Sequence, residues 1–197
     1  SGVARTLFSQ DGGSFTAYGG QFKAGEEGIH ILAYQSYDRV DNTEAVKTAV
    51  IAVDATSPVT TIQAGQPGFT DSNGIMFVTP AVPVIFMAVD PAVNNAASGI
   101  ARIEISVDGG DFIPYTAAVN FTEGIHNVKF RAVDNVGNTE ENKIVNIKSD
   151  NTPPSSMLIP SGTYYLDSES RKYAPITFTY GLSAYDLTVT GVASGVD

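Results

Sequence analysis

The feature that most constrains this chain is that its sequence repeats itself. Two offsets are seen: the early segments recur 97 residues later, and after the loss of one residue the later segments recur 96 residues on. The matched segments are Ser1–Arg5 with Ser98–Arg102, Asp11–Gly13 with Asp108–Gly110, Glu27–His30 with Glu123–His126, Asn42–Glu44 with Asn138–Glu140, and the single residues Asp54 with Asp150 and Asp90 with Asp186. Self-similarity at a fixed period indicates a tandem array of one structural unit.

Within one repeat the apolar residues follow the pattern of strands. Val128, Phe130 and Ala132 occupy every second position, which is the period of a strand with one buried face. Asp108-Gly109-Gly110 is typical of a hairpin turn, and residues 134–138 predict a second one. Short strands at this spacing, without a convincing amphipathic helix, predict an all-β fold. We expect Ig-like β-sandwich repeats of about 97 residues in tandem.

Two proline-containing segments divide the chain. Residues 54–58 and 150–154 are interpreted as linkers, because proline interrupts strand pairing and stiffens the chain. The expected units are a partial repeat over residues 1–55 with the later strands, a complete sandwich over residues 56–152, and a partial repeat over residues 153–197 with the first strands.

The two partial repeats each expose a face that a complete sandwich buries, and such a face favours association. Three arrangements remain open at this point. The chain is a window of a longer array, or residues 153–197 of one subunit complete residues 1–55 of the next, or the two partial repeats of one chain fold together around the middle one. The first two both give an elongated structural element.

Residues 88–154 resemble the bacterial Ig-like tandem repeats of large cell-surface and secreted proteins. The resemblance rests on an Ala-x-Asp before Ser-Gly-Ile, a strand ending in Asp-Gly-Gly, a Glu-Gly-x-His, the motif Ala-x-Asp-x-x-Gly-Asn-x-Glu at residues 132–140, and Asp-x-Thr-x-Pro at residues 150–154. Residues 1–58 carry the second part of this pattern. The resemblance implies a β-sandwich and an extracellular or cell-surface location.

Composition narrows the classes of partner. The formal net charge of −10 opposes binding to a phosphate backbone, so we expect no nucleic-acid partner. No apolar run approaches the roughly 18 residues of a membrane helix, so no membrane span is expected. The chain has no cysteine, which excludes disulfides and thiolate metal sites.

Enzymatic chemistry finds little support. The two histidines, His30 and His126, occupy the same position of the repeat. A residue that supports the fold recurs in every copy, whereas a catalytic residue need not. No nucleophile elbow, phosphate-binding loop or histidine-rich metal motif is present. We therefore expect no catalytic residue and no required cofactor.

Calcium is the one ion that the acidic turns favour. Hard oxygen ligands cluster around a tight turn in each copy. The candidate ligands are Asp38, Asn42 and Glu44 in the first copy and Asp134, Asn138 and Glu140 in the second. Four further aspartates, Asp54, Asp90, Asp150 and Asp186, are expected near the poles of the sandwiches. The alternative is that these side chains bond the backbone of their own turns.

Two functions are compatible with these observations. The first is a structural subunit or segment of an extracellular filament, sheath or cell-surface stalk, with neighbouring identical repeats or other copies as partners, assembled head to tail by strand complementation between the partial end repeats. The alternative is a carbohydrate-binding accessory region of a secreted glycoside hydrolase, with a surface glycan as partner. The tyrosines that favour the alternative gather near the end of the sequence: Tyr164, Tyr165, Tyr173, Tyr180 and Tyr185.

Overall fold

The computed structural model describes residues 2–195 of the chain, and in this part all regular elements are strands. The predicted all-β fold is confirmed. The strands fall into three successive groups that occupy residues 3–53, 59–149 and 155–185.

The first group is a single antiparallel sheet in the order β2-β1-β3-β4. Its strands are β1 (Val3–Gln10), β2 (Thr16–Ala17), β3 (Gly28–Asp38) and β4 (Lys47–Val53). No second sheet covers it among the described residues, so one of its faces stays open.

The second group is a complete sandwich of two sheets. One sheet pairs β5 (Val59–Ala64) with β8 (Val84–Val89). The other has the order β10-β9-β11-β12-β7-β6 and contains β6 (Gly68–Thr70), β7 (Met76–Val78), β9 (Ile100–Val107), β10 (Ile113–Pro114), β11 (Gly124–Asp134) and β12 (Lys143–Ser149). All pairs of neighbouring strands are antiparallel except the pair β12 and β7, which is parallel.

The core of the middle sandwich lies between these sheets. Val84 and Phe86 of β8 face Ile105, Phe130 and other buried residues of the larger sheet. The Phe86 and Phe130 rings lie 5.2 Å apart, centroid to centroid. Alternation of side chains along β8 and β11 places these residues on the inner faces, which is why the period-2 pattern predicted the strands.

The third group is a pair of hairpins. β13 (Ser155–Pro160) pairs with β16 (Tyr180–Tyr185), and β14 (Tyr165–Leu166) pairs with β15 (Lys172–Tyr173). The register repeats that of the middle sandwich 96 residues earlier, since Ile62 pairs with Phe86 and Leu158 with Leu182.

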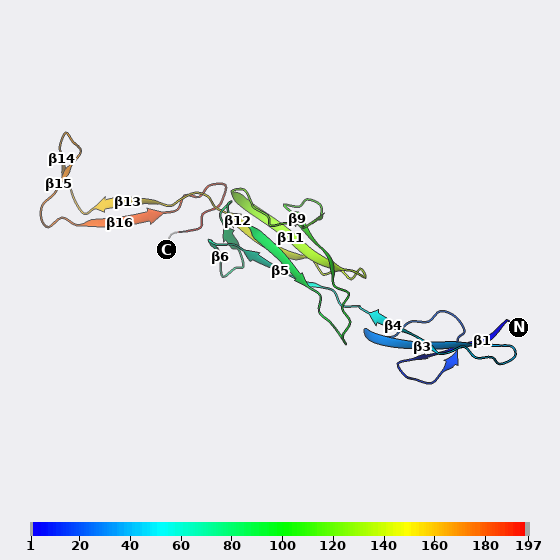
Figure 1. The fold of residues 1–197 in the computed structure, drawn as a ribbon. Helices are drawn as coiled ribbons and strands as arrows, with labels where there is room; N and C mark the ends of the chain where they lie inside the picture. Colours follow the sequence, from blue (N-terminus) through cyan, green and yellow to red (C-terminus); the bar gives the residue numbers. More distant parts are fainter. Residues whose placement is uncertain (1, 196–197) are drawn as a thin grey trace.

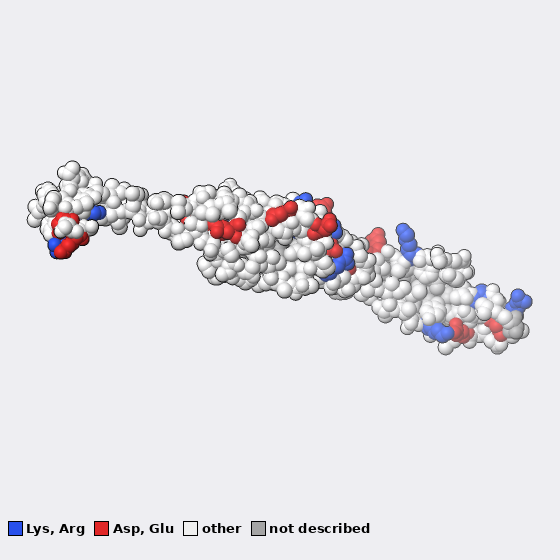
Figure 2. Space-filling model, turned by 90° about the horizontal axis from the view of Figure 1, so that it is seen from above, with Lys and Arg blue, Asp and Glu red and all other residues white. Residues whose placement is uncertain are grey.

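The three groups follow one another along an extended molecule (Figure 1). The first sheet and the last hairpins lie at opposite ends, with the middle sandwich between them. The structure therefore does not fold the two partial repeats of one chain together, which was one of the three expected alternatives. Figure 2 shows the same elongated body, with acidic and basic side chains in small separate groups on the visible face.

Candidate functional site

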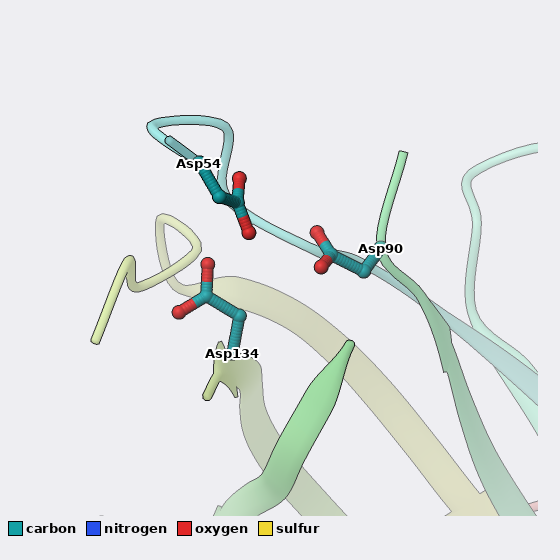
Figure 3. A group of neighbouring side chains, drawn as sticks. All are labelled: Asp54, Asp90 and Asp134. Carbon is teal, nitrogen blue, oxygen red and sulfur yellow. The ribbon is translucent and has the colours of Figure 1, made fainter. Parts of the chain in front are cut away.

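The most distinctive polar site lies where the first group of strands joins the middle sandwich. We call it the joint and define it by Asp54, Asp90, Ser98, Asp134 and Asn138. Asp54 follows β4, Asp90 follows β8, and Asp134 ends β11. One carboxylate oxygen from each of the three aspartates lies within 4.8 Å of the others, and Figure 3 shows the three side chains turned toward a common centre.

Asp134 is held by the turn that follows it. Its Oδ1 accepts hydrogen bonds from the backbone N–H groups of Val136 (3.0 Å), Gly137 (2.7 Å) and Asn138 (2.8 Å), and its Oδ2 accepts one from the Asn138 side chain (2.7 Å). Burial alone would raise the pKa of Asp134, but the hydrogen bonds from Asn138, Gly137 and Val136 hold this pKa below its usual value. The side chain is thus an ionised anchor for the turn.

Asp54 connects the two groups of strands. Its Oδ2 accepts a hydrogen bond from the backbone N–H of Ser98 (2.6 Å), which belongs to the middle sandwich. Its backbone carbonyl accepts a second from the Asn138 side chain (3.2 Å). The contact with Ser98 lowers the pKa of Asp54. The linker is therefore fixed to the pole of the sandwich at two points.

Only one of the two carboxylate oxygens of Asp90 has a hydrogen-bond partner among the described residues. Its Oδ2 accepts a hydrogen bond from the backbone N–H of Gly99 (2.7 Å), while its Oδ1 is buried without a hydrogen-bond partner among the described residues. The same pattern recurs 96 residues later, where Asp186 accepts from Gly195 (2.7 Å) and its Oδ1 is likewise unpartnered.

The second joint repeats the contacts of the first. The backbone N–H of Ser194 donates to Asp150 at 2.7 Å, as Ser98 does to Asp54. A short, mostly exposed loop beside each contact buries one residue, Ala96 at the first joint and Val192 at the second. The two joints therefore share these contacts, whereas the bond from Asn138 and the approach of Asp134 are seen only at the first joint among the described residues.

Thr56 and Thr152 reinforce the two linkers. Each hydroxyl donates to a glutamate that precedes the longest strand of the previous repeat, Thr56 to Glu27 and Thr152 to Glu123, both at 2.9 Å. These bonds tie the linker back to the repeat it leaves, as the aspartates tie it to the repeat it enters.

The six residues predicted as calcium ligands do not all gather at the joint. Asp134 and Asn138 lie there. Asp38 and Asn42 form the corresponding turn at the far end of the first sheet, where Asn42 donates to Asp38 through its backbone (2.9 Å) and its side chain (2.8 Å). Asp38 and Asp134 thus bond mainly within their own turns, as the alternative to calcium binding predicts. The carboxylates that lie close to Asp134 are those of Asp54 and Asp90, the aspartates expected near the poles.

Glu140 and its first-copy counterpart Glu44 lie away from the joint cluster. Glu140 is buried in the middle sandwich, where it accepts hydrogen bonds from the backbone N–H (2.9 Å) and hydroxyl of Thr60 and from the Ala132 N–H (3.1 Å), and pairs with Lys143 (2.7 Å). Burial alone would raise the pKa of Glu140, but Lys143 and Thr60 lower it. Glu44 pairs with Lys47 on the open first sheet.

The two histidines make matching structural contacts. The His126 ring contacts Asp108 (2.9 Å) and the Thr122 carbonyl (2.9 Å), and the His30 ring contacts Asp11 (2.8 Å) and the Glu26 carbonyl (2.7 Å). Each ring belongs to a strand, β3 or β11, and bonds the aspartate of the neighbouring Asp-Gly-Gly turn. This use of both ring nitrogens agrees with the structural role expected from their recurrence.

Comparison with known proteins finds a similarity among solved structures and no match in sequence. Among solved structures, the fibronectin(III)-like modules of Clostridium thermocellum CbhA are similar to it, with 15% identity, 75% of this chain and 78% of that chain covered, and a TM-score of 0.36. A likeness at this level concerns the fold alone. No family model and no curated protein matches the chain. No helix within residues 2–195 has the length and apolar character needed to cross a membrane.

Proposed function

We propose that this chain is a non-catalytic structural segment of an extracellular filament, sheath or cell-surface stalk, of the kind built from bacterial Ig-like tandem repeats. The observation that carries the proposal is the recurrence of one joint. Asp54 to Ser98 and Asp150 to Ser194 are the same contact, 96 residues apart. A rigid unit that joins its neighbour in one fixed way produces a rod, as in other repeat proteins.

The role of the chain in this proposal is mechanical. The linker of the first joint is short, and Pro58 within it is buried against the sandwich. Hydrogen bonds from two repeats converge on the linker, so bending would break several of them at once. An acidic surface keeps such a rod soluble and opposes side-by-side association.

A carbohydrate-binding module remains the second candidate. Four of the five tyrosines that suggest it are exposed and Tyr164 is half-buried; the Tyr165 and Tyr173 rings lie 6.2 Å apart on their hairpin. Their counterparts in the middle sandwich are Phe69 and Phe77, whose rings stack at 4.7 Å. Tyr180 aligns with the core residue Val84. Equivalence to a packed position favours a packing role over sugar stacking.

Calcium binding is a separate proposal that the rod does not require. Its ligands would be the carboxylates of Asp54, Asp90 and Asp134, of which Asp90 retains a free acceptor oxygen. Isothermal titration of the chain with Ca²⁺ tests it, and the absence of a heat signal that depends on Asp90 would remove it.

The rod is tested by small-angle X-ray scattering of the dilute chain. The wild type is expected to show one narrow distribution of maximum dimensions. Asp54→Ala, which removes the acceptor for Ser98, is expected to broaden that distribution without unfolding the middle sandwich. Asp111→Ala, at an exposed site outside the joint, is the matched control. A wild type already as broad as the Asp54 variant would contradict the proposal.

A further inference from the structure

The outer face of the larger sheet in the middle sandwich collects most of the cations of that repeat. Residues 59–149 contain five lysines and arginines, and one of them, Lys143, points to the other sheet, where it bonds the Thr60 carbonyl. The other four belong to neighbouring strands and define what we call the basic face: Arg102 in β9, Lys129 and Arg131 in β11, and Lys148 in β12.

Alternation along each strand places these four side chains on the same side of the sheet. In β11, Phe130 is buried in the core, so Lys129 and Arg131 on either side of it point the other way. Paired residues of neighbouring strands share a side, and the pairing therefore carries the face across the sheet. The pairs are Arg102 with Val133, Glu104 with Arg131, Ser106 with Lys129, Lys129 with Ile144, Ile125 with Lys148, and Lys148 with Phe77.

One acid, Glu104, stands among these cations on the strands of the face. Both of its carboxylate oxygens are occupied by arginines, since Arg102 approaches one at 2.7 Å and Arg131 approaches the other at 2.8 Å. Two guanidinium groups thus share a single carboxylate, and this part of the face keeps a net positive charge.

The two lysines of the face are not neutralised by an ion pair. Among the described residues, no carboxylate lies within ion-pair distance of Lys129 or Lys148. Asp71, in the turn between β6 and β7, interacts with Lys148 at longer range. The face is therefore positive on a chain whose net charge is −10.

The fold does not need these charges, as the first copy of the repeat shows. Three of the four cations have uncharged counterparts in the first sheet: Ala33 for Lys129, Gln35 for Arg131 and Ala52 for Lys148. There β3 pairs with β1 and β4 as β11 pairs with β9 and β12. The histidines and the turn acids recur in both copies, whereas these three cations do not, which favours a binding role over a structural one.

The surface between the cations is uncharged. Asn127 and Asn146 bond each other through their side chains across β11 and β12 at 2.9 Å, and Ile144 is exposed beside them. At the edge of the sheet the exposed ring of Phe69 stacks on Phe77 at 4.7 Å. Sugar rings suit such a surface, because their C–H faces pack on apolar side chains and their hydroxyls bond to amides.

We infer that the basic face binds an anionic polysaccharide, a chain of sugars that carry carboxylate or sulfate groups. Its charge is complementary to that of the face. Outward side chains of β11 follow one another at about 7 Å, so Asn127, Lys129 and Arg131 form a row along which an extended sugar chain can lie. The net charge of −10 opposes the denser charge of a nucleic acid.

This binding goes beyond the rod, since no residue of the joint takes part in it. It also differs in place from the tyrosines near the end of the sequence, because the basic face lies on the middle sandwich between the two joints. Its failure would leave the scattering result for the joint unchanged, so the two proposals are tested separately.

Isothermal titration of the full chain with two polymers tests the inference. Polygalacturonate carries carboxylates and dextran sulfate carries sulfates, and the polymer that binds identifies the anionic group. Binding of at least one is expected at low salt and should weaken as salt is added, since salt screens charges. Neutral dextran is expected not to bind. The absence of binding to both anionic polymers would overturn the inference, as would equal binding of neutral dextran.

The double variant Lys129→Ala/Lys148→Ala removes the two lysines without breaking an ion pair. It is expected to weaken binding at least about tenfold. The matched control is Lys23→Ala/Arg39→Ala, which removes two exposed cations from the first group of strands and is expected to bind as the wild type does. An equal loss in the two double variants would show that net charge governs binding, and would overturn the inference.

Polyglutamate distinguishes a polysaccharide from an acidic protein as the partner. It carries carboxylates without sugar rings, so it is expected to bind more weakly than the better of the two polysaccharides at the same salt concentration. Equal or tighter binding of polyglutamate would overturn the choice of partner. Urea denaturation of the Lys129→Ala/Lys148→Ala variant is expected to match the wild type, because both side chains stand on the outer face.

Discussion

Glu140 is the clearest case of a single residue that holds two sheets together. It lies 80 residues from Thr60 in sequence and yet accepts both polar hydrogens of that residue from inside the sandwich. Because the carboxylate is buried and paired with Lys143, removal of the side chain takes the acceptor from three donors, the Thr60 N–H, the Thr60 hydroxyl and the Ala132 N–H, and the counter-charge from Lys143.

We therefore expect Glu140→Ala to lower the free energy of unfolding of the middle sandwich by about 3 kcal/mol. The neighbouring Glu141 is exposed, and Glu141→Ala is expected to change it by less than about 0.5 kcal/mol. Urea denaturation at neutral pH measures both. A loss in the Glu140 variant no larger than that in the Glu141 variant would contradict this account.

His126 makes the stability of the middle sandwich depend on pH, and the direction of this dependence follows from the pKa of the ring. Burial would lower the pKa of His126, but its bonds to Asp108 and the Thr122 carbonyl raise the pKa above the usual value. The charged ring is thus favoured in the folded chain. Its contribution to stability is complete below the unfolded pKa of about 6.5 and is lost as the pH rises through the higher folded pKa.

The Asp108→Asn variant is expected to lower the pKa of His126, as followed by NMR of the ring proton. It should also cost more stability at pH 5 than at pH 8, since Asp108 favours the charged ring. Asp111→Asn is the control. A His126 pKa that stays unchanged in Asp108→Asn would show that the ion pair does not form.

At the scale of elements, equivalent strands differ in what covers them. Phe130 in β11 is packed against Phe86, whereas its counterpart Tyr34 in β3 lies on the open face. We expect Phe130→Ala to cost about 3–5 kcal/mol in stability. Tyr34→Ala should cost clearly less in the dilute chain, as measured by hydrogen exchange of β3 amides. Equal losses would mean that the first sheet is already covered.

The repeat and the two-residue period predicted much of the element scale. The strands at residues 100–107 and 124–134 follow from alternation, and the turn at Asp108-Gly109 has the positive φ angles, 52° and 80°, that its sequence favours. The parallel strand β7 was not predicted. Met76–Val78 is only three residues long and buried throughout, so it shows no alternation.

The candidate site was predicted only in part. Asp54, Asp90 and Asp134 stood out as acids at poles or turns, but their convergence depends on how the linker packs against Ser98. Glu140 was expected at a metal site because a glutamate that ligates a metal and a glutamate that holds two strands together look the same in a sequence. Which role it has depends on Thr60, which lies far away in sequence.

At the scale of the whole molecule, an open four-stranded sheet and the paired strands of residues 155–185 lie on either side of one complete sandwich, and the contact of Asp54 with Ser98 recurs between Asp150 and Ser194. This arrangement extends in one dimension (Figure 1).

Electron microscopy of the purified 197-residue chain over a range of concentrations at physiological salt tests the central claim most directly. The account predicts slender, straight particles of one length, because the joint holds neighbouring repeats in one relative orientation. Compact particles, or particles that bend at the joint to many different angles, would contradict it.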